Sequence, residues 1–93
     1  MLLQLNVLIE LDPQKRLQTF LKRGLDFARA NEIFADAAAT FEDTRCHYGE
    51  HRFITFGFLD DRLTVIIWTA RGESRRIISM RIANERENKK YNR

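Results

Sequence analysis

The chain has 93 residues, of which 44% are hydrophobic and 31% are charged, and its formal net charge is +3. This length allows one compact core and excludes two, and the composition excludes a disordered or low-complexity chain. We therefore expect a single domain over residues 1–93. Its basic character suits a polyanionic partner, and RNA, DNA, an acidic protein or an anionic membrane would each satisfy it.

The basic residues gather near the C-terminus, because residues 71–93 hold eight Lys or Arg and three Glu. The chain has a single cysteine, Cys46, so no intrachain disulfide can form, and this predicts a cytoplasmic location. The apolar segment at residues 1–12 has no basic start and is too short to span a bilayer. It predicts a first strand, and we expect no membrane association.

A helix is predicted over residues 13–23. Asp12 is a good N-cap, Pro13 suits the first helical position, and Gly24 is placed for the C-terminal turn. Its predicted buried stripe consists of Leu17, Phe20 and Leu21. A second, purely structural helix is predicted from the cap at Asp26 to about Ala35.

The remaining pattern is that of short strands followed by a helix. A short strand is possible at residues 38–41, and three strands are predicted at 52–58, 62–69 and 75–82. Hairpin-length connections between these three imply antiparallel neighbours. Asn84 then caps a last helix with a basic end. The sequence thus predicts an α+β fold, a small antiparallel twisted sheet with two N-terminal helices and one C-terminal helix.

The strand at residues 75–82 carries the strongest functional pattern. Its alternation places one set of residues on one side and a second set on the other. The two sets are Arg75, Ile77, Ser79 and Arg81, and Arg76, Ile78, Met80 and Ile82. Arginines backed by an apolar face are typical of an anion-binding groove, and equally of a solvated edge. Unless a bulge re-aims one of them, only one of Arg76 and Arg81 can line the groove, and we expect Arg81.

An ordered set of short strings connects the chain to a known family. The set consists of Asp12-Pro13-x-Lys15, Gly24-Leu25-x-Phe27, residues 30–36, Arg52 with Gly57, Arg71-Gly72, Arg76-Ile77-Ile78-Ser79-x-Arg81-x-Ala83, Glu85-Arg86 and Tyr91. It covers nearly the whole chain from Glu10 onward and resembles the BrnT family of bacterial toxins, which belongs to the RelE-like group of small ribonucleases.

The resemblance implies a RelE-like fold and a growth-inhibiting ribonuclease of a type II toxin-antitoxin system. It also implies a BrnA-like antitoxin with a ribbon-helix-helix part as partner, and DNA would be contacted only through this antitoxin. The expected assembly is either a heterotetramer of toxin and antitoxin or a homodimer of the toxin. Three positions depart from the family's pattern: Leu11, Thr19 and Arg23 stand where it usually has Trp, Asn and His. These departures bear on any catalytic role of the first helix.

Metal-free RNA cleavage needs a proton acceptor for the ribose 2′-OH, a cation for the phosphorane and a proton donor for the 5′-oxygen. Arginine suits the second task, since its fork contacts phosphate bidentately, but its permanent charge makes it a poor base. We therefore expect Arg52, Arg76 and Arg81 to hold the phosphate, and Lys15 and Tyr91 to transfer protons. Further RNA contacts are expected from Arg71, Arg75, Trp68, Arg86 and Lys89.

Two alternatives stay open beside this interpretation. Trp68 suits base stacking, but a Trp among apolar neighbours is more often part of a core. Cys46, His47 and His51 lie within six residues, yet a closed zinc site needs a fourth ligand and the usual paired cysteines are absent. We therefore expect neither a metal nor another cofactor, and His51, which adjoins Arg52, stays a candidate general acid.

Two functional classes remain. The first is a ribonuclease toxin that cleaves RNA without metal and is neutralised by its antitoxin. The alternative is a non-catalytic or attenuated basic binding module for nucleic acid or an acidic protein partner.

Overall fold

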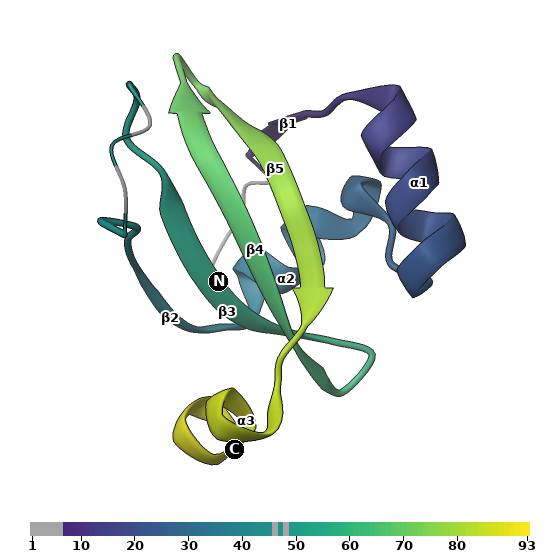
Figure 1. Ribbon diagram of the computed structural model, residues 1–93, viewed down its shortest axis with the longest axis vertical. Coiled ribbons are helices and arrows are strands. Elements are labelled where there is room, and N and C mark those ends of the chain that lie inside the picture. Colours follow the sequence, from purple (N-terminus) through teal and green to yellow (C-terminus); the bar gives the residue numbers. More distant parts are fainter. Residues whose placement is uncertain (1–6, 46, 48) are drawn as a thin grey trace, which may run out of the picture.

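The computed structural model describes residues 7–45, 47 and 49–93, so residues 1–6 of the predicted first strand, and Cys46, lie outside the described residues. Five strands form one sheet in the order β1-β5-β4-β3-β2 (Figure 1). The elements are β1 (Leu8–Glu10), α1 (Pro13–Arg23), the 3-10 helix η1 (Phe27–Arg29), α2 (Ala30–Ala35), β2 (Ala37–Glu42), β3 (Phe53–Leu59), β4 (Arg62–Arg71), β5 (Ser74–Ile82) and α3 (Glu85–Tyr91). The predicted α+β class and the order of the helices are confirmed.

The sheet is mixed, so the prediction of a purely antiparallel sheet is wrong. β2, β3, β4 and β5 pair antiparallel with their neighbours, but β1 pairs parallel with β5. Hairpin-length connections force antiparallel pairing, whereas the long chain between β1 and β5 leaves the direction of β1 open. The parallel register places Glu10 beside Arg76.

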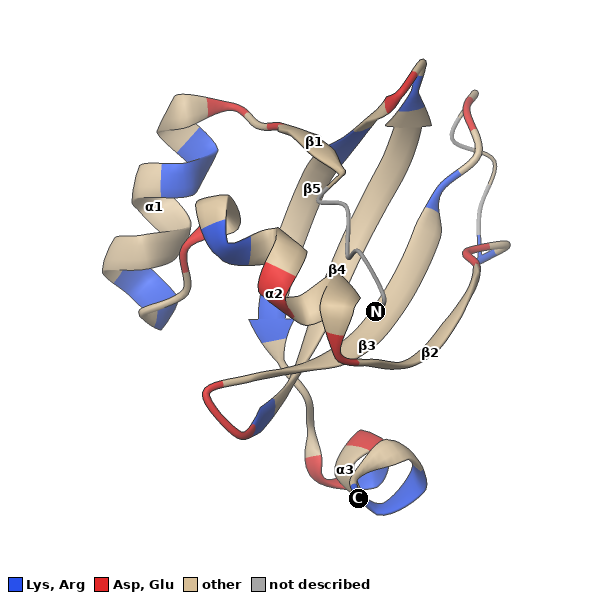
Figure 2. Cartoon of the chain, turned by 180° about the vertical axis from the view of Figure 1, so that it is seen from behind, with Lys and Arg blue, Asp and Glu red and all other residues tan. Residues whose placement is uncertain are grey.

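One face of the sheet, called here the α2 face, is covered by η1 and α2, which lie in front of the strands in Figure 2. Phe27, Ile33 and Ile66 are almost completely buried in its core. Gly57 of β3 makes the close approach of α2 possible, because a Cβ there would lie 2.7 Å from Cγ2 of Ile33 and still nearer to the Ile33 carbonyl oxygen.

The opposite face, called the α3 face, has its own core around Phe56 and Val65. Tyr91 of α3 stacks on the Phe56 ring at a centroid distance of 4.4 Å. The start of α3 is closed by a capping box, in which the Asn84 side chain accepts from the Glu87 N–H and the Glu87 carboxylate accepts from the Asn84 N–H. α3 lies at the lower end of the sheet in Figure 1, and it therefore covers part of this face.

The predicted buried stripe of α1 is wrong, because none of its residues is buried. The side chains of Leu17, Phe20 and Leu21 are 58%, 53% and 72% exposed. α1 stands to the side of the sheet, next to β5, rather than over either face (Figure 1). Amphipathic periodicity predicted the helix correctly, but it does not specify which surface the apolar stripe will meet.

Polar contacts hold α1 in place. Arg23 Nη1 donates to the carbonyl oxygen of Met80 on β5 at 2.8 Å, and Arg16 Nε donates to the Asp26 carboxylate at 2.7 Å. Leu11, just before α1, packs against the α2-face core, and Thr19 is half-buried. Two of the three departures from the family's pattern, Leu11 and Arg23, thus contact the rest of the fold.

A β-bulge interrupts β5. Ser79 pairs with Ile67, but Ile77 pairs with the next residue of β4, Trp68, so Ile78 is the extra residue. The bulge shifts the alternation by one position. Ile77 and Met80, predicted on opposite sides of the strand, both lie in the α2-face core, and Ile78 is only half-buried.

We expect Ile77→Ala to lower the free energy of unfolding by about 3 kcal/mol, because it removes a side chain that is 2% exposed from a closed core. Ile78→Ala, the matched control on the same strand, should cost less than half of that. Urea denaturation of both variants checks the prediction. A larger loss for Ile78→Ala would mean that the strand alternates regularly and that the bulge is misplaced.

Candidate functional site

The bulge in β5 brings Arg76 and Arg81 to the same face of the sheet. Arg81 pairs with Val65, a member of the α3-face core, and Arg76 pairs with Thr69. Thr69 follows Val65 by four residues, so alternation places both on the α3 face. Four residues of strand separate the two arginines by roughly 13 Å, so they occupy different ends of this face of β5.

Arg81 is engaged by α3. Its Nη1 and Nη2 donate to the two carboxylate oxygens of Glu87 at 2.7 and 2.8 Å. This bidentate hydrogen bond holds the pKa of the Glu87 carboxyl below its usual range. Arg81 thus ties α3 to β5, and its charge is already compensated, whereas the sequence led us to expect that it would be the main phosphate ligand.

Arg76 has a different environment. Its side chain is half-buried and, within residues 7–45, 47 and 49–93, makes no hydrogen bond or ion pair. A half-buried guanidinium without a counter-ion retains its full capacity to bind a phosphate.

Glu10 of β1 lies directly beside Arg76 in the parallel register. Its predecessor Ile9 packs against the α2-face core, so alternation turns Glu10 toward the α3 face together with Arg76. The sequence analysis did not select Glu10, because only the long-range pairing of β1 with β5 brings it to the arginine. A carboxylate that lies near a guanidinium without pairing with it can accept a proton from a hydroxyl group of a ligand that the guanidinium binds.

Arg52 and Arg71 lie at the same end of the sheet as Arg76. Arg52 Nε is 3.3 Å and Arg71 Nη2 is 4.0 Å from the carboxylate of Glu50, so two cations share this carboxylate. The Thr69 hydroxyl, in the cross-strand row of Arg76, donates to the His51 carbonyl oxygen and thereby fixes the chain just before Arg52. Figure 2 shows basic segments at the upper ends of β3, β4 and β5.

Trp68 and Arg75, which the sequence predicted to contact RNA, lie on the opposite face of the sheet from Arg76. Trp68 is 8% exposed, its indole N–H donates to the Thr55 hydroxyl, and its ring stacks on Phe53. The Arg75 guanidinium lies 4.3 Å from the ring centroid of Phe34 and 4.7 Å from that of Trp68, and burial lowers its pKa. Both side chains contribute to the α2-face core.

The two expected proton-transfer residues are far from each other. Lys15 is an exposed residue of α1, whereas Tyr91 is on α3, and these helices lie apart in Figures 1 and 2. Arg86 and Lys89, the expected RNA contacts on α3, are exposed, and Lys89 pairs with Glu85 at 3.6 Å. The structure therefore brings Arg52, Arg71 and Arg76 together, but not Lys15.

A cavity of about 500 Å³ adjoins this end of the sheet. It is lined by Glu42, Asp43, Thr44, His47, Gly49, Glu50 and His51. Its three carboxylates make it unsuited to a phosphate, and His51 Nδ1 lies 2.9 Å from the Glu42 carboxylate. The described part of the chain holds no group of three His, Cys, Asp or Glu residues that could bind a metal ion, and Cys46 lies outside that part.

The fold and the site define a small α+β protein with a basic sheet face suited to a phosphodiester chain. A family model described as a ribonuclease toxin, BrnT, of type II toxin-antitoxin systems matches residues 11–87. The chain belongs to this family, and the family implies an antitoxin protein as partner. A comparison with curated proteins gives no match. In the described residues, no helix is both long and apolar enough to cross a bilayer.

The Arg81–Glu87 pair generates a prediction about acid stability. A lowered pKa in the folded state means that Glu87 stabilises the protein above its ordinary pKa, and that this contribution is lost as the pH falls through the folded pKa. Glu87→Gln should therefore lower the free energy of unfolding by about 1 kcal/mol at pH 7. At pH 3 the difference from the parent should be small.

Urea denaturation of the parent and the variant at both pH values measures the difference. Glu85→Gln is the control, because the Glu85 side chain is 87% exposed and its loss should change little at either pH. A Glu87→Gln deficit that stays the same from pH 7 to pH 3 would contradict the assignment of the ion pair.

Proposed function

We propose that the protein is a metal-independent endoribonuclease toxin with a RelE-like fold, acting in the cytoplasm on RNA bound to the α3 face. Membership of the BrnT family supports the ribonuclease class. The observation that carries the location of the site is the placement of Arg76, without an ion pair in the described structure, beside Glu10.

In this proposal Arg76 binds the scissile phosphate and stabilises the extra charge of the phosphorane. Glu10 accepts the proton of the ribose 2′-OH, whose oxygen then attacks the phosphorus atom. The bond to the 5′-oxygen breaks, which leaves a 2′,3′-cyclic phosphate and a 5′-OH. Arg52 and Arg71 hold a neighbouring phosphate.

His51 is the proposed proton donor to the departing 5′-oxygen. Its carbonyl oxygen accepts a hydrogen bond from the hydroxyl of Thr69, the residue that pairs with Arg76 on β5. The backbone of His51 is therefore close to the proposed phosphate site. Its Nδ1 contacts Glu42, whose strand partner Phe53 packs against the α2-face core, so the exposed ring would have to turn toward the α3 face to reach the departing oxygen. Tyr91 stacks on Phe56 in the part of the α3 face covered by α3, and it is the second candidate for this role.

We further propose that the partner is a BrnA-like antitoxin with a ribbon-helix-helix part, and that the complex contacts DNA only through this part. A dimer of the antitoxin would join two toxins in a heterotetramer. The family supports an antitoxin partner in general. Sizing of the co-expressed complex tests this arrangement.

Purified protein should cleave total RNA in the presence of EDTA, because the proposed chemistry uses only side chains. Arg76→Ala should reduce the rate about 100-fold or more through loss of phosphorane stabilisation. Arg62→Ala, which removes an exposed arginine outside the proposed site, is the matched control and should retain the rate. Inhibition by EDTA that zinc or magnesium reverses would contradict the mechanism, and RNA binding without cleavage would support the alternative of a basic binding module.

Glu10→Gln should reduce the single-turnover cleavage rate about 100- to 10,000-fold, with little change in RNA affinity. Glu73→Gln, at the exposed β4–β5 turn, is the control and should behave like the parent. The proposed role of Glu10 is wrong if Glu10→Gln cleaves RNA at the parental rate.

A further inference from the structure

We propose that a trough beside α1 is the docking site for a helical segment of the antitoxin that presents large apolar side chains and carboxylates. The inference rests on the proposed function, since it takes the antitoxin as the partner, but it concerns a surface separate from the RNA site.

The trough consists of two adjoining cavities of about 290 and 170 Å³, both lined by Phe20 and Asp26. The first also contacts Pro13 and Leu17, and the second reaches Leu25, Leu59 and Ile82. The trough therefore runs from the start of α1 to the end of β5, and its lining combines these apolar side chains with the charged residues Arg16, Asp26, Arg29, Asp60 and Arg62.

Leu17 and Phe20 of the trough belong to an exposed apolar stripe of α1, which continues outside the two cavities to Leu21. Leu17, Phe20 and Leu21 follow the i, i+3, i+4 spacing of one helix face, and each is more than half exposed. α1 buries no residue, so this stripe contributes nothing to the core of the chain. A contiguous group of large exposed apolar side chains is typical of a protein-binding surface.

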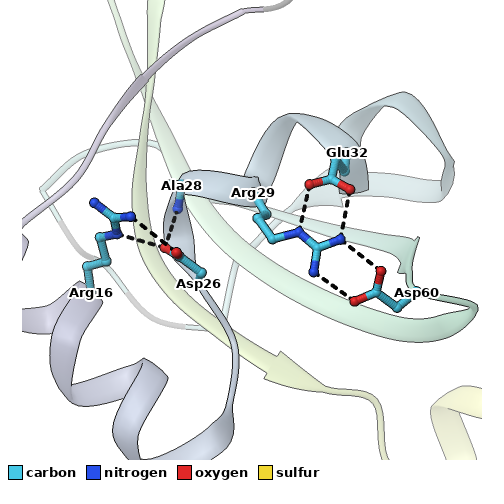
Figure 3. A network of polar contacts seen from close by, with 6 residues as sticks. All are labelled: Arg16, Asp26, Ala28, Arg29, Glu32 and Asp60. Carbon is cyan, nitrogen blue, oxygen red and sulfur yellow. Dashed lines mark hydrogen bonds and ion pairs between the residues drawn. The ribbon is translucent and has the colours of Figure 1, made fainter.

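The rim of the trough is already ordered by ion pairs, as Figure 3 shows. Arg16 binds Asp26, and Arg29 binds both Glu32 and Asp60, with shortest distances of 2.7 Å in each pair. The hydrogen bond from Arg16 holds the pKa of the Asp26 carboxyl below its usual range. A partner would meet a rim that needs no rearrangement, which lowers the entropic cost of binding.

The charge around the trough selects the kind of occupant. α1 carries Lys15, Arg16, Lys22 and Arg23 and no acidic residue. Arg62, which lines the second cavity, has no ion pair in the part of the chain that the structure describes. Arg16 and Arg29 are already paired with carboxylates, but Lys15, Lys22 and Arg23 make no ion pair in the described residues. These three cations of α1 attract an acidic segment and repel the α1 helix of a second copy. An RNA strand would contact the cations of α1 but would leave the apolar stripe exposed to water.

The location of the trough has a functional consequence. α1 lies to the side of the sheet next to β5 (Figure 1), whereas the proposed RNA site lies on the α3 face. An antitoxin anchored at the trough would depend on α1 for affinity, but RNA cleavage would not. Substitutions in the stripe should therefore separate neutralisation from toxicity.

The test uses the full toxin and the proposed BrnA-like antitoxin. Leu17→Gln/Leu21→Gln removes two exposed apolar side chains without a change of charge, and Gln14→Ala/Gln18→Ala is the matched control on the same helix. The stripe variant should melt like the parent and arrest growth when expressed alone. It should bind the antitoxin about 100-fold or more weakly, and co-expression should not neutralise it, whereas the control should be neutralised.

Neutralisation and affinity of the stripe variant equal to those of the parent would overturn the docking proposal. So would a dimer of the free parent toxin that the stripe variant converts to a monomer, since a second copy would then be the occupant. If the parent neither cleaves RNA nor arrests growth, but the stripe variant still loses affinity for the antitoxin, the docking site stands and the proposed function fails.

Discussion

The arrangement of this protein depends on one extra residue in β5. The bulge at Ile78 lets Ile77 and Met80 enter the same core while Arg76 and Arg81 both remain on the opposite face. In a regular strand one of these arginines would face the apolar core, where an unpaired charge is strongly destabilising. The bulge thus allows a single strand to support a buried core and a basic surface at once.

The basic surface is divided between two roles along the strand. At the α3 end, Arg81 is paired bidentately with Glu87 and fixes the C-terminal helix. At the other end, Arg76 makes no ion pair in the described structure, Glu10 lies beside it in β1, and Arg71 at the end of β4 and Arg52 before β3 lie at the same end of the sheet. The proposed phosphate ligand Arg76 and the proposed proton acceptor Glu10 thus lie together at this end of the strand.

Sequence patterns predicted the parts of the fold that depend on local interactions. The caps are as expected: the Asp12 carboxylate accepts from the Gln14 N–H at 2.9 Å, and Asn84 forms a complete capping box. The three central strands differ from their predicted bounds by at most two residues, since turn residues and alternation are both local signals.

The parts that were missed depend on contacts between distant segments. The parallel pairing of β1 with β5 brings Glu10 to the site, and neither strand encodes it locally. A bulge leaves almost no sequence signature, so regular alternation was predicted through Ile78, and Ile77 and Met80 were placed on opposite faces of β5. The apolar stripe of α1 was assigned to the core because helical periodicity is the same for an internal contact and for a partner's surface.

The central claim is that RNA binds to the α3 face at Arg76 and Glu10. The most direct test is an NMR titration of backbone amides with a 2′-O-methyl oligoribonucleotide, which binds but lacks the attacking hydroxyl. The account predicts the largest shift changes at Glu10, Thr69 and Arg76, with α1 unaffected. Changes confined to α1, or to the Arg75 and Trp68 side of the sheet, would contradict it.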